Sequence, residues 1–237
     1  MVQLVKFIKR DCFMRTKLVA FIFMISTSCF GSIVPFKAEF LMKAPMISIN
    51  TTREVIIEGN KGSFLFSGKN ILGSLRISSD FEISETELSS ISYELKSKML
   101  LLNQKTKLEF GEFITSSGTH DWKIDNPKPN INLLDPLTAQ IALPFEILKG
   151  KKEVKLYLPN LKNGEIEENT FRVVQDDTLI IDGIEYDCVV VQRIREHENR
   201  ITKYWLAKSL ENLLIKTLDD NDDKTVEITM TKLLSFG

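Results

Sequence analysis

Strict alternation of apolar and polar residues near the C-terminus is the feature that most constrains this fold. Between residues 185 and 194 the even positions are mostly apolar, and the charged side chains stand at odd positions. In the last such run, one face carries Val226, Ile228 and Met230 and the other carries Glu227, Thr229 and Thr231. A period of two is typical of half-buried strands, and a slip of one residue would bury a carboxylate. The pattern therefore predicts antiparallel strands between residues 171 and 233.

Turn sequences divide these runs into a meander. Asn163-Gly164 and Asp182-Gly183 favour tight turns, and His197-Glu198-Asn199 and the acidic segment 219–223 indicate two more. A short loop, residues 208–212, joins two further strands. Because the strands follow one another with few crossovers, this layout excludes an α/β fold.

The first half of the chain continues the same pattern. Residues 53–58 predict a strand with Val55 and Ile57 inward, and a hairpin turn follows at residues 59–62. Further strands are expected at residues 63–67, 72–83 and 105–113, the last with Leu108 and Phe110 inward. Residues 85–99 fit a helical stripe and a strand equally well. Residues 115–130 are rich in Ser, Gly, Asp, Asn and Pro, which predicts a loop.

One helix start is clear. Asp135 followed by Pro136 is typical of an N-cap and a first helical position. The expected buried stripe consists of Leu137, Ile141, and Phe145 or Leu148, and Pro144 is expected to kink or end the helix. Alternation then resumes at residues 153–158. The predicted fold class is mainly β: a curved antiparallel meander, forming a half-barrel or barrel-like sheet, with one short helix packed on it.

Residues 1–31 differ from the rest of the chain. A basic stretch precedes an apolar run at residues 18–25, and small residues follow up to Gly31. This order predicts a secretory signal peptide, since the apolar run is too short to cross a bilayer. Met14 is an alternative start. We expect one exported β domain at residues 32–237 and a periplasmic location.

Cleavage after Gly31 would leave Cys188 as the only thiol, so no internal disulfide is expected. The sequence before Cys29 faintly resembles a lipoprotein cleavage site, and membrane association is expected only if Cys29 is acylated. Cleavage would also leave 31 − 5 = 26 basic and 32 − 1 = 31 acidic residues, a net charge of −5. This charge argues against nucleic acid as a partner.

Several segments together match a known pattern. They are residues 132–143, Phe171-Arg172-Val173, Asp182-Gly183, residues 186–193 and residues 203–207. In this order they resemble the short helix and C-terminal strands of exported bacterial proteins of domain-of-unknown-function family 3108. A Leu-Pro pair frequent in that family is replaced by Leu213-Leu214-Ile215-Lys216, without proline.

The resemblance implies an antiparallel β protein of the Gram-negative envelope and favours a strand at residues 91–99. It implies no reaction. By looser analogy, the predicted curved sheet is similar to half-barrel carriers of lipids and lipoproteins, although fold alone is a weak guide to function.

Residues capable of catalysis or metal binding are sparse. His120 could act as a base oriented by the Asp121 carboxylate, with Ser116, Ser117 or Thr119 as the nucleophile. No Gly-x-Ser-x-Gly turn supports such a triad. A solvated loop is therefore the preferred interpretation. The acidic turn 219–223 lacks the glycine and distal glutamate of an EF-hand loop. Cys188 is expected to be a small buried hydrophobe. No catalytic residue, metal site or cofactor is predicted.

Binding remains as the leading hypothesis, because phenylalanine is abundant at 15 residues. Aromatic side chains on the expected strands would line a cavity if the barrel is half open, or form the core if it is closed. The candidate cavity residues are Phe64, Phe66, Phe81, Phe110, Phe171, Tyr186, Tyr204 and Trp205. We predict a non-enzymatic protein that binds a lipid, a lipoprotein or another envelope component. The alternatives are a structural or assembly partner with a filled core, and a hydrolase using the His120 loop.

Overall fold

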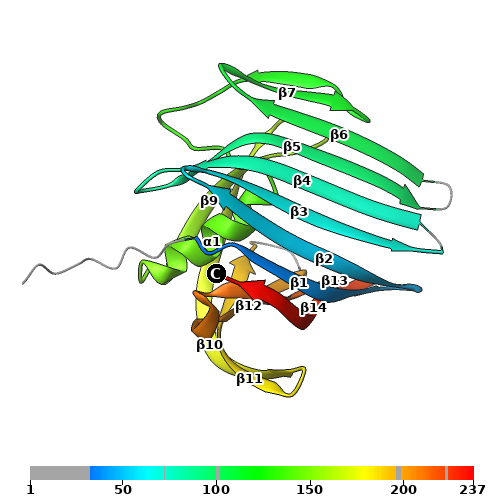
Figure 1. The fold of residues 1–237 in the computed structure, drawn as a ribbon. Coiled ribbons are helices and arrows are strands. Elements are labelled where there is room, and N and C mark those ends of the chain that lie inside the picture. Colours follow the sequence, from blue (N-terminus) through cyan, green and yellow to red (C-terminus); the bar gives the residue numbers. More distant parts are fainter. Residues whose placement is uncertain (1–32, 72, 100–101, 196–198, 222–223) are drawn as a thin grey trace, which may run out of the picture.

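The computed structural model describes residues 33–71, 73–99, 102–195, 199–221 and 224–237. The predicted signal peptide, with Met14, Cys12 and Cys29, lies outside these residues, as does most of the turn predicted at residues 197–199. Within the described part, one 14-stranded antiparallel sheet curves around a single α-helix (Figure 1). This architecture confirms the predicted fold class.

The elements follow one another as a long meander interrupted once by the helix. In chain order they are β1 (Phe36–Ala44), β2 (Ile47–Glu58), β3 (Lys61–Asn70), β4 (Gly73–Ile83), β5 (Leu88–Met99), β6 (Leu102–Phe110), β7 (Phe113–Gly118), β8 (Trp122–Asp125), α1 (Thr138–Leu148), β9 (Glu153–Pro159), β10 (Ile166–Ile181), β11 (Ile184–Ile194), β12 (Ile201–Ala207), the 3-10 helix η1 (Lys208–Leu210), β13 (Leu213–Asn221) and β14 (Lys224–Phe236).

The first and last strands meet in the middle of the sheet. The spatial order runs β8-β7-β6-β5-β4-β3-β2-β1-β14-β13-β12-β11-β10-β9, so β1 joins an N-terminal half to a C-terminal half. The sheet edges are β8 and β9, and no ladder of hydrogen bonds joins them in the described part of the chain. The sheet is therefore barrel-like without being closed.

Loop contacts bridge the two edges in place of a ladder. Trp122 Nε1 on β8 donates a hydrogen bond to the Leu161 carbonyl beyond β9, at 3.1 Å. The Leu134 amide donates to the Tyr157 carbonyl on β9, at 2.9 Å. Gly164 lies under the Trp122 ring with φ +77°, where a Cβ atom would come within 2.8 Å of the ring. The turn predicted at Asn163-Gly164 thus allows the close approach of the two edges.

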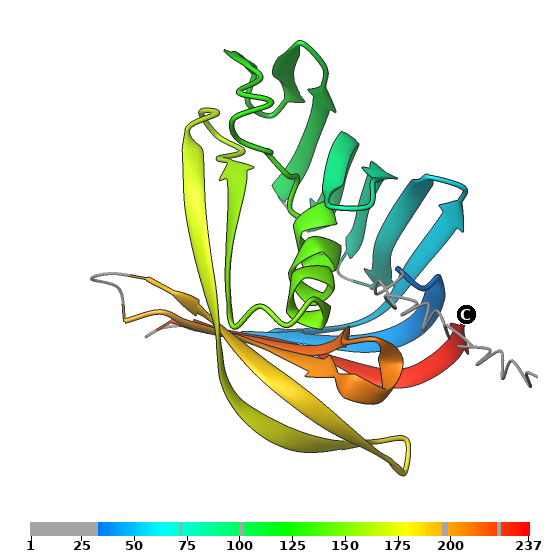
Figure 2. The same ribbon diagram turned by 90° about the vertical axis from the view of Figure 1, so that its left-hand side faces the viewer.

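Helix α1 lies inside the curve of the sheet (Figure 2). Its residues Thr138, Ala139, Ala142, Leu143, Pro144, Phe145 and Ile147 are buried. Leu137 and Phe145 are buried as predicted, but burial extends beyond one stripe because the sheet curves around the helix. The helix continues past Pro144 to Leu148, so the expectation that it could end at this proline was wrong. None of the described helices has the length and apolar character needed to cross a membrane.

The alternation predicted for the strands is reproduced by burial. Val55, Leu108, Cys188, Val190 and Met230 are all buried, with at most 2% of their surface exposed. The ambiguous segment 85–99 contains strand β5.

Two sequence-based expectations for loops were wrong in part. Residues 115–130 contain the end of β7 and all of β8. Despite the polar composition of this segment, β7 pairs with β6 on one side and with β8 on the other, and its residues Ile114 and Ser116 are buried. The acidic turn begins later than expected, since Asp219 pairs with Val226 inside the β13–β14 ladder.

Candidate ligand-binding site

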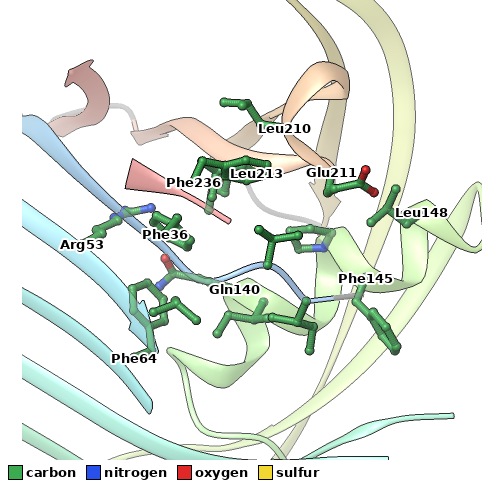
Figure 3. A pocket seen from close by; sticks show the side chains of 16 residues that line it. Phe36, Arg53, Phe64, Gln140, Phe145, Leu148, Leu210, Glu211, Leu213 and Phe236 are labelled. Carbon is green, nitrogen blue, oxygen red and sulfur yellow. The ribbon is translucent and has the colours of Figure 1, made fainter. Parts of the chain in front are cut away.

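A small apolar cavity lies where α1 faces the junction of the two sheet halves. We call it the phenylalanine cavity; its volume is about 60 Å³, and Phe36, Phe64, Phe145 and Phe236 are among the residues that line it. Its polar lining residues are Arg53, Gln140 and Glu211. In Figure 3, Arg53 and Phe36 lie at one side of this cavity and Leu148 at the other. The cavity can hold a few small groups.

A larger cavity of about 330 Å³ adjoins it between α1 and the concave face of β10–β14. We call it the arginine cavity, because four arginines and one aspartate contribute to its otherwise largely apolar walls: Arg53, Arg193, Arg195, Arg200 and Asp219. Arg53, Gln140, Pro144 and Leu214 line both cavities. A third space, of about 340 Å³, shares Arg193 and Leu158 with the arginine cavity and extends to His120.

Arg53 is the unusual residue of this site. It lies on β2 in the inward register of Val55, so the alternation that buries Val55 also buries Arg53, which is 4% exposed. Its guanidinium lies over the rings of Phe40, at 4.5 Å, and Phe66, at 5.2 Å. No described residue accepts a hydrogen bond from its buried Nε atom. Burial lowers the pKa of Arg53 to about 10, which leaves the side chain charged at neutral pH.

The other polar groups of the arginine cavity include a paired cluster. Arg200 holds Asp219 through two hydrogen bonds, of 2.8 Å from Nε and 2.5 Å from Nη2. Thr202 Oγ1 donates to the same carboxylate at 2.7 Å, and Arg195 Nη1 donates to Thr202 Oγ1 at 2.8 Å. The bonds from Arg200 lower the pKa of Asp219. Because Arg200 compensates the negative charge of Asp219, the remaining charge on the cavity walls is positive.

A second buried charge lies at the start of α1. The Asp135 carboxylate accepts hydrogen bonds from the hydroxyls of Ser79, Ser90 and Thr138, at 2.6–2.7 Å. It also accepts from the amides of Leu137 and Thr138, at 2.8 and 3.0 Å. Burial raises the pKa of Asp135, and these hydrogen bonds oppose the shift. The Asp135 carboxylate thus accepts amides at the start of the helix, although α1 begins at Thr138 and not at Pro136 as predicted. The same carboxylate fastens α1 to β4 and β5.

The predicted aromatic residues separate into two groups. Phe64 lines the phenylalanine cavity, while Phe171 and Tyr204 line the arginine cavity, with their rings in edge contact at 5.7 Å. The other five do not line these two cavities. Phe66 lies beside Arg53, and Phe81 and Tyr186 are buried in the core. Phe110 is half-buried against the core, and Trp205 Nε1 donates a hydrogen bond to Asp177 Oδ2 at 2.7 Å.

Sequence reasoning missed Arg53 and Arg193. Arg53 could have been found, because the strand expected at residues 53–58 places it on the same face as Val55 and Ile57. Arg193 offered a weaker signal: it stands at an odd position of its strand, among the charged residues assigned to the solvent face. The bulge between Val173 and Gln175 in the β10–β11 ladder changes the local register in this region.

The residues considered for catalysis make other contacts. Ser116 Oγ donates to the carbonyl oxygen of His120, at 2.7 Å, and the Asp121 carboxylate accepts from the Gly118 amide, at 2.8 Å. The serine and aspartate therefore hold the loop and do not reach the imidazole through these bonds. Cys188 is fully buried, which raises its pKa to about 11 and disfavours the thiolate. In the described part of the chain, no cluster of three or more His, Cys, Asp or Glu could hold a metal ion.

Comparison with known proteins identifies the fold. No protein-family model matches the chain, so the resemblance to family 3108 is not confirmed. No curated protein matches it in sequence. A crystal structure from Brucella abortus, described as a beta-barrel-like protein of domain of unknown function DUF1849, superimposes with a TM-score of 0.54. The match has 9% identity and covers 85% of this chain and 97% of that one, so this chain has a beta-barrel-like fold similar to that of the Brucella protein.

Proposed function

We propose that this protein is an exported, non-enzymatic binding protein that holds the apolar chain of a lipid or lipoprotein between α1 and the curved sheet. The observation that carries the proposal is the set of adjoining cavities, in which neighbouring cavities share apolar residues such as Pro144, Leu214 and Leu158. Together they extend from the sheet junction at Phe36 to the His120 loop. The signal-peptide pattern of residues 1–31 supports a periplasmic location.

The size of the cavities favours a slender ligand. Known ligand sites are mostly apolar clefts of roughly 300–1,000 Å³ with a few polar groups that orient the ligand. The arginine cavity, at about 330 Å³, falls at the lower end of that range. A single acyl chain suits this space better than a bulky ring system, because it is slender and can bend.

Native mass spectrometry tests the proposal directly. The protein is purified, without detergent, from the envelope of the cell that exports it, and its mass is compared with that of the bare polypeptide. We expect extra mass that is released into organic solvent. Bare polypeptide, together with no uptake of added oleic acid or oleyl alcohol, would overturn the proposal.

A cavity-filling pair of variants localises the binding. Ala139 lines the arginine cavity, whereas Ala142, less than one turn further along α1, lines a different recess. Ala139→Leu adds volume to the arginine cavity and should weaken uptake of an acyl ligand about tenfold, while Ala142→Leu should leave it within about twofold. Equal effects of both substitutions would argue against this cavity. Melting temperatures of both variants control for overpacking.

One observation favours a second candidate function. Helix α1 lies inside the curve of the sheet, and its buried side chains belong to the same core as both sheet halves. Such filling suits a structural or assembly partner that acts through its outer surface. A protein that carries no ligand and takes up none would support this reading.

A further inference from the structure

We propose that Arg53 binds the anionic head group, a carboxylate or phosphate, of a single-chain amphiphile whose apolar chain lies along the arginine cavity. This inference rests on the proposed function and adds the chemical class of the ligand. Arg53 lines both the arginine cavity and the phenylalanine cavity, so a group bound to it would lie where they adjoin.

Arg53 is a buried cation without an internal partner among the described residues. The side chain is buried, and no described residue forms a hydrogen bond or ion pair with it. Burying a charge without a partner is costly, so buried charges in proteins are normally paired. Aromatic contacts with Phe40 and Phe66 offset only part of this cost. An oxyanion from outside the chain would supply the missing acceptor.

The guanidinium of Arg53 keeps its hydrogen-bond donors available for a ligand. Its central carbon lies 4.5 Å from the centre of the Phe40 ring and 5.2 Å from that of Phe66, and none of its N–H groups has an acceptor among the described residues. The planar guanidinium fits carboxylate and phosphate oxygens in pairs, which a hydroxyl head group cannot match. This arrangement is therefore suited to an oxyanion.

The walls of the arginine cavity carry a net positive charge. Four arginines and one aspartate line the arginine cavity, so the formal charge of its walls is plus three. The aspartate is held by Arg200 and Thr202, and Arg193 has no hydrogen bond or ion pair with a residue that the structure describes. Positive walls in a confined space concentrate anions and repel cations. The cavity thus favours an anionic amphiphile over a neutral or cationic one.

Competition binding with matched probes tests this assignment. Oleic acid, oleyl phosphate and oleyl alcohol are each titrated against a neutral fluorescent acyl probe bound to the mature protein. The three probes share one apolar chain and differ in the head group. We expect the wild-type protein to bind the acid or the phosphate at least about tenfold more tightly than the alcohol.

Substitutions at Arg53 then assign the preference. Arg53→Met keeps much of the side-chain length without the charge and should reduce the preference to less than about threefold, while Arg53→Lys should retain part of it. Arg172→Met is the matched control, because Arg172 is more than half exposed and paired with Glu153 at 2.7 Å, outside the cavities. This control should keep the wild-type preference. Melting curves establish that each variant is folded.

The outcomes separate this inference from the proposed function. Equal binding of the acid, phosphate and alcohol by the wild-type protein would overturn the role of Arg53 while leaving acyl-chain binding intact. A preference that survives in Arg53→Met would do the same. If none of the three probes binds, the proposed function itself fails.

Discussion

Two buried charges, Asp135 and Arg53, are treated in opposite ways by the same fold. Asp135 is fully buried and accepts hydrogen bonds from three hydroxyls and two amides. Arg53 is 4% exposed. Its guanidinium contacts two aromatic rings but has no hydrogen-bond acceptor among the described residues. The first charge fastens α1 to the sheet. The second adds no such link and faces a cavity instead.

The difference separates a structural charge from a candidate binding residue. A buried carboxylate with all its acceptor positions used contributes to one defined arrangement of helix and sheet. A buried cation with unused donors lowers the stability of the empty protein, and it gains its partner only when a ligand arrives. Substitutions at the two positions should therefore have opposite consequences for stability and for binding.

Trp205→Ala should have the largest effect on the free energy of unfolding, and it removes packing without removing a charge. Trp205 is 8% exposed and donates a hydrogen bond to Asp177 Oδ2, at 2.7 Å. The substitution should destabilise the protein by about 3–5 kcal/mol, because it leaves a cavity and an unused acceptor. Urea denaturation measures this value. An unchanged midpoint would mean that the ring contributes nothing to the fold.

Asp135→Asn should have the next largest effect. The asparagine presents an NH₂ group where the carboxylate accepts hydroxyl donors from Ser79, Ser90 and Thr138, so at least one buried bond is lost. We expect a loss of about 2–3 kcal/mol in urea denaturation, with little change in acyl-ligand affinity per folded molecule. A neutral effect on stability would remove the contrast with Arg53.

Asp219→Asn tests a charge that lies between these extremes. Arg200 holds the pKa of Asp219 below its ordinary value, so the pair stabilises the fold above about pH 4, and this contribution is lost as the pH falls through the folded-state pKa. The substitution should cost about 0.5–1 kcal/mol at pH 7, since Arg200 is partly exposed, and less at about pH 3, which lies below the ordinary pKa of an aspartate. Melting temperatures at both pH values provide the check. A difference independent of pH would contradict the pairing.

Arg53→Met should have the smallest effect on stability, with the opposite sign. Removing an unpaired buried cation relieves its desolvation, and the methionine retains apolar contacts with Phe40 and Phe66. We expect the free energy of unfolding of the ligand-free protein to rise by less than about 1 kcal/mol. A loss as large as that of Asp135→Asn would show that Arg53 has a structural partner.

Local sequence signals predicted the regular parts of the fold. Alternation located the buried residues Tyr186, Cys188 and Val190 of β11 and Met230 of β14, but it missed Val191, which is also buried. The Asp135-Pro136 pair located the start of α1 to within three residues. Strands β7 and β8 were not predicted in full, because their polar composition resembles that of a loop. They are strands because β7 pairs with β6 and β8 pairs with β7. Which aromatic residues line cavities was also beyond the sequence, since Phe64 and Phe81 have the same alternating environment along their strands.

The amino-acid sequence by itself determined an antiparallel meander with one helix, because a period of two and a capped helix start are properties of short segments. It also placed Arg53 on the inward face of its strand through the alternation that buries Val55. Only the tertiary structure decided that β1 pairs with β14, that the edges β8 and β9 stay unpaired, and that α1 leaves cavities on both sides of Arg53. These features depend on residues far apart in the chain, and local patterns carry no information about such contacts.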